Sequence, residues 1–181
     1  YILSNGERIQ LYFHPENFCH LLGLDKIAKS VTTNVGIHNS HKGHLGWKRI
    51  KEGRLTIQSL RGLGGSYFNH YTERKIVFFY TLPQLLLSGS AMVQYVPISA
   101  SKLNVELILF DTFAKSWVHL GLEKESDWDS YYPKSFFIER ISAAAPASKY
   151  VYGQPLVYSI TWRHKYNRFP TRRSSRPTQL R

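Results

Sequence analysis

His20 is the side chain in the first part of the chain whose type and setting best suit acid–base chemistry. It lies in residues 13–24, which are typical of one short helix, because Pro15 fits the first helical position and Gly23 can end the helix in a left-handed conformation. Three apolar residues at i, i+3 and i+4 form one stripe: Phe18, Leu21 and Leu22. His20 is therefore expected on the polar side, where its imidazole can exchange protons near neutral pH or simply face solvent as a surface histidine.

Two expected strands each gather polar side chains on one face. Over residues 134–141, alternation places three residues together: Ser135, Phe137 and Glu139. Over residues 156–163, it brings together Val157, Ser159, Thr161 and Arg163. Hydroxyls can donate hydrogen bonds to phosphate oxygens and an arginine can neutralise phosphate charge, so both faces are candidate phosphate contacts. Polar residues on an outward sheet face are also ordinary, so the pattern fits a plain solvated face equally well.

A histidine-rich stretch and a glycine-rich stretch each suggest a more specific site. Three histidines have spacings that a metal site can use: His38, His41 and His44. No Cys, Asp or Glu accompanies them and Lys42 lies among them, so we expect residues 31–46 to form a mobile polar loop near phosphate rather than a metal site. Residues 61–66 lack the Gly-Lys-Ser/Thr ending of a phosphate-binding P-loop, and we expect a turn there.

The elements that would position these side chains follow one another as helices and then strands. Spacing and capping signals predict helices at residues 15–22, 26–30 (capped by Asp25), 45–52 and 72–87, the last kinked or split at Pro83, with a helix or strand at 55–60. A period of two predicts strands at residues 92–96, 103–109, 115–122, 134–141 and 156–163, after a short strand or extended arm at 7–13. An acidic loop is expected at residues 123–129. Helices followed by an antiparallel meander indicate an α+β domain.

Composition and charge narrow the class of partner. The 181 residues carry 24 Lys and Arg against 12 Asp and Glu, a formal charge of +12. Residues 162–181 contain seven basic and no acidic residues, so the remainder still carries +5. This excess favours an anionic partner, and nucleic acid is the commonest one. We expect one domain over residues 1–163 and a basic, mobile tail over residues 164–181.

Cysteine content and hydropathy exclude two further classes. Cys19 is the single cysteine, which excludes an internal disulfide framework and a cysteine-rich zinc site and is typical of a protein from a reducing cytoplasm. No stretch reaches the roughly 18–20 consecutive apolar residues that a membrane span needs. The sequence therefore predicts a cytoplasmic protein with no membrane partner.

Four segments, in this order, resemble a known nuclease family. They are residues 18–24 (Phe-Cys-His-Leu-Leu-Gly-Leu), the helical residues 47–53, the long helix that contains Glu73 and Arg74, and residues 132–139. The sharpest parts are the Phe-x-His-Leu-x-Gly-Leu and Ser-Phe-Phe-x-Glu runs. Their order and spacing resemble the fourth subtype of the phage-type barnase/EndoU/colicin E5-D/RelE-like nucleases, over roughly residues 9–162.

The resemblance implies a fold and a reaction. The fold would be N-terminal helices packed on one face of a four- to five-stranded antiparallel sheet. The reaction would be metal-independent cleavage of RNA, possibly tRNA or another translation-linked RNA, without a cofactor. In such an enzyme the 2′-OH of the substrate attacks the neighbouring phosphate, so the protein supplies a base, an acid and groups that bind the phosphate oxygens. A toxin or phage effector of this kind acts in the bacterial host cytoplasm and needs an inhibitor, expected to be acidic.

The resemblance also assigns roles to residues of this sequence. His20 would be the acid or base, Ser135 would bind phosphate, and Glu139 would hold the His20 tautomer or act as a second base. The additional phosphate-binding candidates are cationic or hydroxyl side chains: Lys26, Lys134, Ser159, Thr161 and Arg163. The last three follow from strand alternation alone.

Two other functions fit the same residues. A non-catalytic RNA-binding protein would use the basic face for phosphates and stack bases on aromatic side chains such as Tyr67, Phe68 and Tyr71. A partner-binding phage protein would bind RNA weakly and without the steep salt dependence of phosphate contacts. Catalysis requires His20, Ser135 and Glu139 to converge in one cleft, whereas binding does not.

Overall fold

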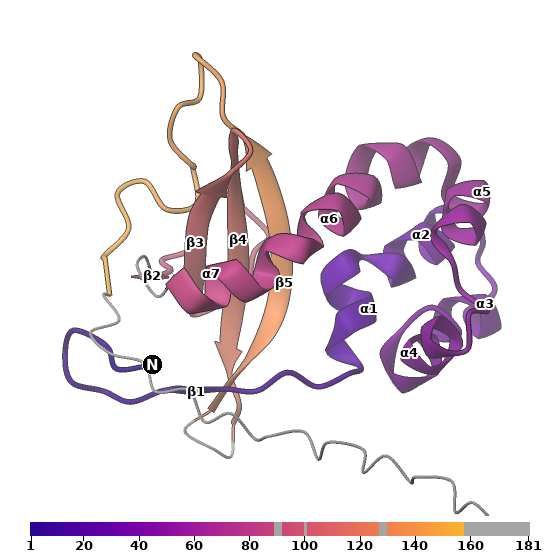
Figure 1. The fold of residues 1–181 in the computed structure, drawn as a ribbon, viewed down its shortest axis with the longest axis horizontal. Helices are drawn as coiled ribbons and strands as arrows, with labels where there is room; N and C mark the ends of the chain where they lie inside the picture. The colour runs from indigo at the N-terminus through magenta and orange to yellow at the C-terminus, as the bar shows by residue number, and fades with distance from the viewer. Residues whose placement is uncertain (89–91, 100, 127–129, 158–181) are drawn as a thin grey trace, which may run out of the picture.

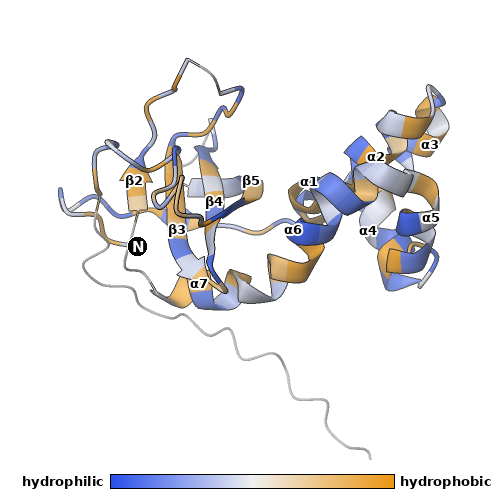
Figure 2. Cartoon of the chain, turned by 90° about the horizontal axis from the view of Figure 1, so that it is seen from above, coloured by the Kyte–Doolittle hydropathy of each residue, from blue (hydrophilic) through white to orange (hydrophobic). Residues whose placement is uncertain are grey.

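The computed structural model shows a helical lobe joined to a sheet, and it describes residues 1–88, 92–99, 101–126 and 130–157. The helices in chain order are α1 (Asn17–Leu22), α2 (Leu24–Val31), α3 (Val35–Asn39), α4 (Gly43–Lys51), α5 (Ile57–Tyr67), the π-helix η1 (Phe68–Thr72), α6 (Glu73–Phe78), the 3₁₀ turn η2 (Phe79–Thr81) and α7 (Leu82–Ser88). The strands are β1 (Gln10–Leu11), β2 (Met92–Gln94), β3 (Leu107–Phe113), β4 (Ser116–Lys124) and β5 (Ser130–Arg140). In both views, α1 and α6 lie between the sheet and helices α2–α5 (Figures 1 and 2).

The sheet has the strand order β1-β5-β4-β3-β2, and the predicted α+β class is confirmed. Strands β2 to β5 pair antiparallel, as the meander predicted. The short strand expected within residues 7–13 is β1, but it pairs parallel to β5, through Gln10 and Ser130, and so adds a parallel edge to the predicted antiparallel sheet. Of the expected strand at residues 156–163, Leu156 forms a bridge with Val93, and residues 158–163 lie outside the described residues.

Two hydrophobic clusters hold the helical side of the molecule together. One lies between the sheet, α1 and α7 and contains the fully buried Leu85, Leu120 and Phe136. The other fills the helical lobe around Ile27 and Phe68. Helix α7 crosses one face of the sheet (Figure 1), while a third, smaller cluster lies on residues of β2 and β3 together with Tyr150 and Val151. Within the described residues, Tyr150 and Val151 thus pack on the sheet face opposite α7.

Two segments expected to be irregular are helical instead. Residues 31–46 contain α3 and the start of α4. Helix α3 begins at Asn34, whose side chain accepts a hydrogen bond from the Ile37 N–H at 3.1 Å. The glycines and histidines of this segment favoured the prediction of a loop. Residues 61–66 continue α5, which begins with a reciprocal capping box between Thr56 and Ser59. Only Gly65 departs from helical geometry there, at φ +48°.

Smaller differences occur at other element boundaries. Asp25 does not cap α2, because Gly23, at φ +72°, ends α1 and directly precedes α2. Glu123 belongs to β4 rather than to an acidic loop, and residues 127–129 of that loop lie outside the described residues. Pro83 lies in the first turn of α7, so the predicted long helix is split, as a proline requires.

Candidate active site

His20 lies on α1 where this helix packs against β5. Its side chain is exposed on one side, while neighbouring elements crowd the other side. This partial burial lowers the pKa of His20 below its ordinary value, and the positive charges of Lys26 and Lys75 act in the same direction. The charge of Asp25 and a hydrogen bond with the backbone of Lys134 oppose the shift. At neutral pH the imidazole is therefore mostly neutral and ready to accept a proton.

Two lysines from different helices share this environment. Lys26 lies on α2 and Lys75 on α6, and each charge acts on His20. Burial lowers the pKa of Lys75 to about 8, with a further lowering by Lys26 and an opposing effect of Asp25. Lys75 is thus a cation at neutral pH whose proton is held less tightly than that of an ordinary lysine.

Asp25 is the acidic group whose charge acts on His20 and Lys75. It is only 7% exposed, and its Oδ2 pairs with the Lys29 ammonium at 3.3 Å. Its Oδ1 is buried and has no hydrogen-bond partner among the described residues. The Asp25 carboxylate offsets part of the repulsion between the two lysines, because its charge raises the pKa of both His20 and Lys75.

Close helix packing brings these side chains together. A Cβ atom at Gly64 of α5 would lie 2.6 Å from Ile27 Cγ2, so only glycine lets α5 approach α2 at this point. The chain then passes through η1 into α6, which packs against β5 as α1 does. Gly23 connects α1 and α2 with no intervening residue, which sets His20 and Lys26 on either side of a single sharp turn.

Lys134, a predicted phosphate-binding cation, contacts His20 through its backbone. The Lys134 backbone forms a hydrogen bond with the His20 ring. The Lys134 ammonium is paired with the Glu123 carboxylate, which also accepts a hydrogen bond from the Tyr132 hydroxyl. The ammonium charge of Lys134 is therefore largely compensated, and so is the acidic charge of Glu123.

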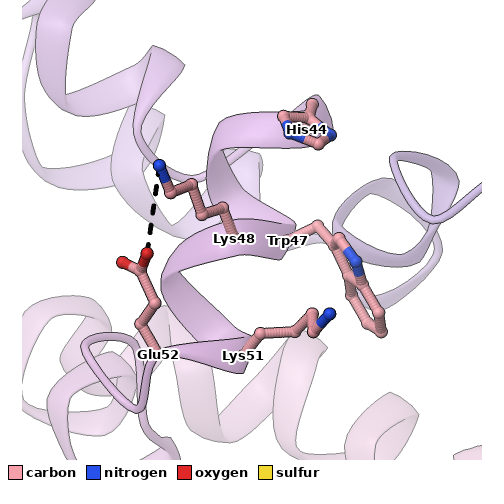
Figure 3. A pocket seen from close by; sticks show the side chains of 5 residues that line it. All are labelled: His44, Trp47, Lys48, Lys51 and Glu52. Carbon is pink, nitrogen blue, oxygen red and sulfur yellow. Dashed lines mark ion pairs between the residues drawn. The ribbon is translucent and has the colours of Figure 1, made fainter.

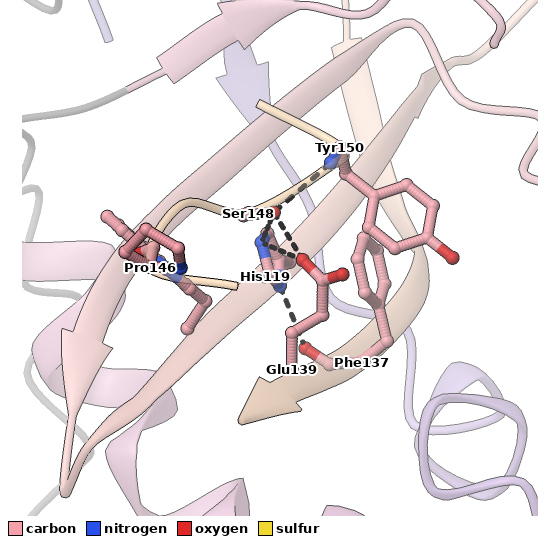
Figure 4. A network of polar contacts seen from close by, with 7 residues as sticks. His119, Phe137, Glu139, Pro146, Ser148 and Tyr150 are labelled. Carbon is pink, nitrogen blue, oxygen red and sulfur yellow. Dashed lines mark hydrogen bonds and ion pairs between the residues drawn. The ribbon is translucent and has the colours of Figure 1, made fainter. Parts of the chain in front are cut away.

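Glu139 belongs to a buried network on the other face of the sheet (Figure 4). The predicted shared face of Ser135, Phe137 and Glu139 is confirmed by the register, which pairs these residues with Gly121, His119 and Trp117 of β4. The Ser148 hydroxyl donates to Glu139 and lies 2.8 Å from His119 Nε2. No polar contact of Glu139 within the described part of the chain reaches His20.

His119 anchors this network beneath residues 142–157. It is fully buried, its ring stacks on Phe137 at 4.4 Å, and burial lowers its pKa to about 4 despite an opposing hydrogen bond to the Phe137 carbonyl. Tyr150 packs edge-on against Phe137 at 4.7 Å (Figure 4). Ser148 is only 2% exposed and the Glu139 side chain 22%, and their contacts with His119 hold the Ser148 segment against the sheet.

The remaining candidates fall into three groups. Ser159, Thr161 and Arg163 lie outside the described residues. Phe68 is only 1% exposed and cannot stack a base, whereas Tyr71 is 62% exposed and packs against Tyr67 at 4.8 Å. His38 and His41 are occupied by hydrogen bonds to the Thr32 and Ile37 carbonyls.

Sequence reasoning missed Lys75 and Asp25. Arg74 and the lysine after it follow an expected helix start, so a basic pair was visible in one of the segments that resemble the nuclease family. The local pattern does not indicate whether Arg74 or Lys75 lies near His20, because that depends on how α6 packs. Asp25 was expected as a helix cap, and its charge was not connected with the histidine five residues earlier.

Cys19 provides no nucleophile at this site. It is fully buried, and burial, helped by the charge of Asp25, raises the pKa of its thiol to about 11. The reactive thiolate is therefore scarce at neutral pH. Among the described residues, no three His, Cys, Asp or Glu side chains are grouped so that they could hold a metal ion.

Comparison with known proteins identifies one family. A family model described as phage-Barnase-EndoU-ColicinE5/D-RelE like nuclease4 matches residues 1–166, which is most of the chain. No curated protein and no solved structure matches. Within the described part of the chain, none of the helices has the length and apolar character that a membrane crossing requires.

Proposed function

Because this chain belongs to the phage barnase/EndoU/colicin/RelE-like nuclease family, we propose that it is a metal-independent endoribonuclease with its active site at His20, Lys26 and Lys75. The observation that carries the proposal is the meeting of these three side chains, from α1, α2 and α6, within the range of one another's charges. The pKa of the histidine is lowered below neutrality and that of Lys75 to about 8, which is the order that a base and an acid need at pH 7.

In the proposed reaction, neutral His20 removes the proton of the substrate 2′-OH. The 2′-oxygen then forms a bond to the adjacent phosphorus, and the bond from phosphorus to the 5′-oxygen breaks. Lys75 gives its proton to the departing 5′-oxygen, and Lys26 neutralises the charge that develops on the phosphate oxygens. The products are a 2′,3′-cyclic phosphate and a 5′-OH, and solvent restores both protonation states.

The backbone of Lys134 and the carboxylate of Asp25 support this assignment without touching the substrate. A hydrogen bond between the His20 ring and the Lys134 backbone holds one ring nitrogen, so the other can face the 2′-OH. Asp25 keeps Lys75 largely protonated beside Lys26, because two lysines in one partly buried site would otherwise lower each other's pKa further.

Ser135 and Glu139 remain predictions as catalytic residues. The contacts of Glu139 with Ser148 and His119 give a structural reason for its presence, and the register places Ser135 on the same face of β5. Ser135→Ala and Glu139→Gln would show a loss of cleavage at constant thermal stability if these side chains act in catalysis.

We further propose that the substrate is tRNA or another translation-linked RNA in the host cytoplasm. The net charge of +12 supports an RNA partner and an acidic inhibitor that blocks the same basic face. The family model, which matches residues 1–166, supports a single nuclease-like domain over residues 1–163, with residues 164–181 as an additional basic segment that contacts RNA by charge.

The experiment that tests the proposal is incubation of the full chain with total RNA in EDTA, beside His20→Ala and Lys75→Ala. We expect discrete fragments that end in 2′,3′-cyclic phosphate with the wild type and loss of these fragments with both variants. His14→Ala is the matched control, because His14 is an exposed histidine just before α1. This variant should cleave RNA as the wild type does. Intact RNA with the wild type would overturn the proposal.

One observation favours the second candidate, an RNA-binding protein without catalysis. Tyr71 is 62% exposed and packs beside Tyr67. The pKa of Tyr67 is raised by burial, by Tyr71 and by the charge of Asp25. This effect of Asp25 indicates that the aromatic pair lies close to the proposed site. Stacked bases bind such surfaces without being cleaved. Salt-sensitive binding of intact RNA by the wild type and by His20→Ala alike would support this alternative.

A further inference from the structure

Helix α4 carries a second stripe of residues that the proposed active site does not use. Four side chains at i, i+3, i+4 and i+7 line a surface hollow of about 390 Å³, together with Glu52: His44, Trp47, Lys48 and Lys51 (Figure 3). This spacing places them on one helix face, at whose edge Trp47 also packs against the cluster of the helical lobe. Packing explains the indole in part, but not the two lysines and the histidine that surround the hollow.

The indole of Trp47 is held in place from below. Its ring meets the Phe18 ring edge-on at 5.2 Å, and it is half-buried. Gly46 allows this close approach of α4 to α1, because a Cβ atom there would lie 2.8 Å from Cys19 Sγ. The indole is thus fixed before any ligand binds, which reduces the entropy lost on stacking.

The charge around the hollow is positive. Lys48 reaches Glu52 at 3.9 Å, a long pair between exposed side chains, and Glu52 is also paired with Arg54 at 3.3 Å. Lys51 forms no ion pair with any described residue. The hollow therefore combines a fixed aromatic surface with two lysines, of which Lys51 has no ion pair among the described residues, and such surfaces bind single-stranded nucleic acid.

The hollow is connected to the proposed active site through α1. Phe18 lies against both Trp47 and Phe79, and His20 follows it two residues later on the same helix. Phe79 in turn contacts Phe136 of β5 at 5.3 Å. This aromatic series packs α4 against α1, the helix that carries His20, and against β5.

We propose that the α4 hollow is a subsite for a single-stranded RNA nucleotide outside the cleaved linkage, with the base stacked on Trp47 and its phosphates at Lys48 and Lys51. This inference rests on the proposed RNA substrate, but it does not depend on cleavage. A base in a duplex is already stacked and cannot reach the indole, so the subsite selects single strands. An acidic peptide would need the lysines but not the fixed ring.

The test measures RNA binding in a His20→Ala background, so that the substrate stays intact. The probe is a fluorescein-labelled single-stranded RNA of about ten nucleotides, within the length that such surfaces bind. We expect Trp47→Ala to weaken binding about ten-fold or more and Trp47→Phe to weaken it much less. Lys51→Ala should reduce the slope of log affinity against log salt by about one. Leu45→Ala, an exposed residue of the same helix outside the hollow, should bind normally.

Each outcome decides between the alternatives. Equal binding by Trp47→Ala and its parent, or an equal loss for duplex and single-stranded RNA, would overturn the subsite. If Trp47→Ala does not fold, Trp47→Phe and Lys51→Ala carry the same test. If Trp47→Ala and Lys51→Ala lose binding to an acidic peptide but keep their binding to RNA, the hollow belongs to a protein partner and the proposal is overturned. Absence of RNA cleavage by the wild type would refute the nuclease activity alone, because the binding results are obtained independently.

Discussion

At the scale of single residues, the pKa values of His20 and Lys75 connect the site to a measurable reaction. Burial lowers the pKa of both groups, yet it leaves one mostly neutral and the other mostly protonated at pH 7. Each group is thereby in the state that its proposed role needs. A pair of carboxylates or a metal-bound water could also supply an acid and a base, but the described residues around α1, α2 and α6 supply a histidine and a lysine.

The pH dependence of kcat/KM should therefore be bell-shaped. Activity rises with pH through the lowered pKa of His20, since only the neutral ring accepts a proton, and falls through about pH 8 as Lys75 loses its proton. Lys75→Arg should abolish the alkaline fall and reduce kcat by about 100- to 10,000-fold, because arginine keeps the charge but does not donate its proton. An unchanged kcat in Lys75→Arg would show that only the charge matters.

At the scale of elements, glycine determines where the helices of the lobe meet. Gly64 lets α5 contact α2 beside Ile27, and Gly46 lets α4 contact α1 beside Cys19. These two contacts set the direction in which α5 passes into η1 and α6, and hence where Lys75 lies relative to His20. The π-helix η1 lies within this path, at a position where such irregular turns often accompany function.

Gly64→Ala should destabilise the protein by about 1–3 kcal/mol, because the added methyl group would overlap Ile27 in a fully buried contact. Gly62→Ala is the matched control on the same helix. A Cβ at Gly62 meets nothing within 4 Å, so this substitution should stabilise α5 by up to about 1 kcal/mol. Urea denaturation measures both effects. Equal free energies of unfolding for the two variants would contradict the close α2–α5 contact.

At the scale of the whole molecule, the two faces of the sheet have different covers. Helix α7 covers one face, and Ser148, Tyr150 and Val151 pack on the other, while Leu156 bridges to Val93 at the edge of the sheet. The proposed active site lies beside β5, where α1 and α6 pack. The contacts of the His119 network therefore join Ser148 to strands β4 and β5, and they give this network a role in the stability of the fold.

The His119 network should make the protein sensitive to acid. His119 has a pKa of about 4 in the folded protein against 6.5 for an exposed histidine, so the unfolded chain takes up a proton more readily. Stability should fall as the pH drops from 6.5 towards 4, by up to about 3 kcal/mol. His119→Gln should be less stable at pH 7 but show a smaller loss on acidification, measured by urea denaturation at several pH values. The exposed-histidine control, His14→Ala, should retain the slope of the wild type.

The local sequence determined much of the fold because the signals it used are short-range. The helix around His20, the split at Pro83 and the alternation of Ser135, Phe137 and Glu139 follow from backbone geometry and side-chain spacing within a few residues. The helices within residues 31–46 were missed, since their capping by Asn34 was hidden among glycines and histidines that also favour loops.

Only the tertiary structure decided which of these residues meet. Lys75 faces Lys26 and His20 because α5 packs closely on α2, and Glu139 faces His119 because residues 142–157 return over the sheet. The sequence by itself placed His20 on a helix and established the basic charge of the chain, since neither depends on distant contacts. The assembly of a site from α1, α2, α6 and β5 depends on packing between segments far apart in the chain, and side-chain periodicity carries no information about that packing.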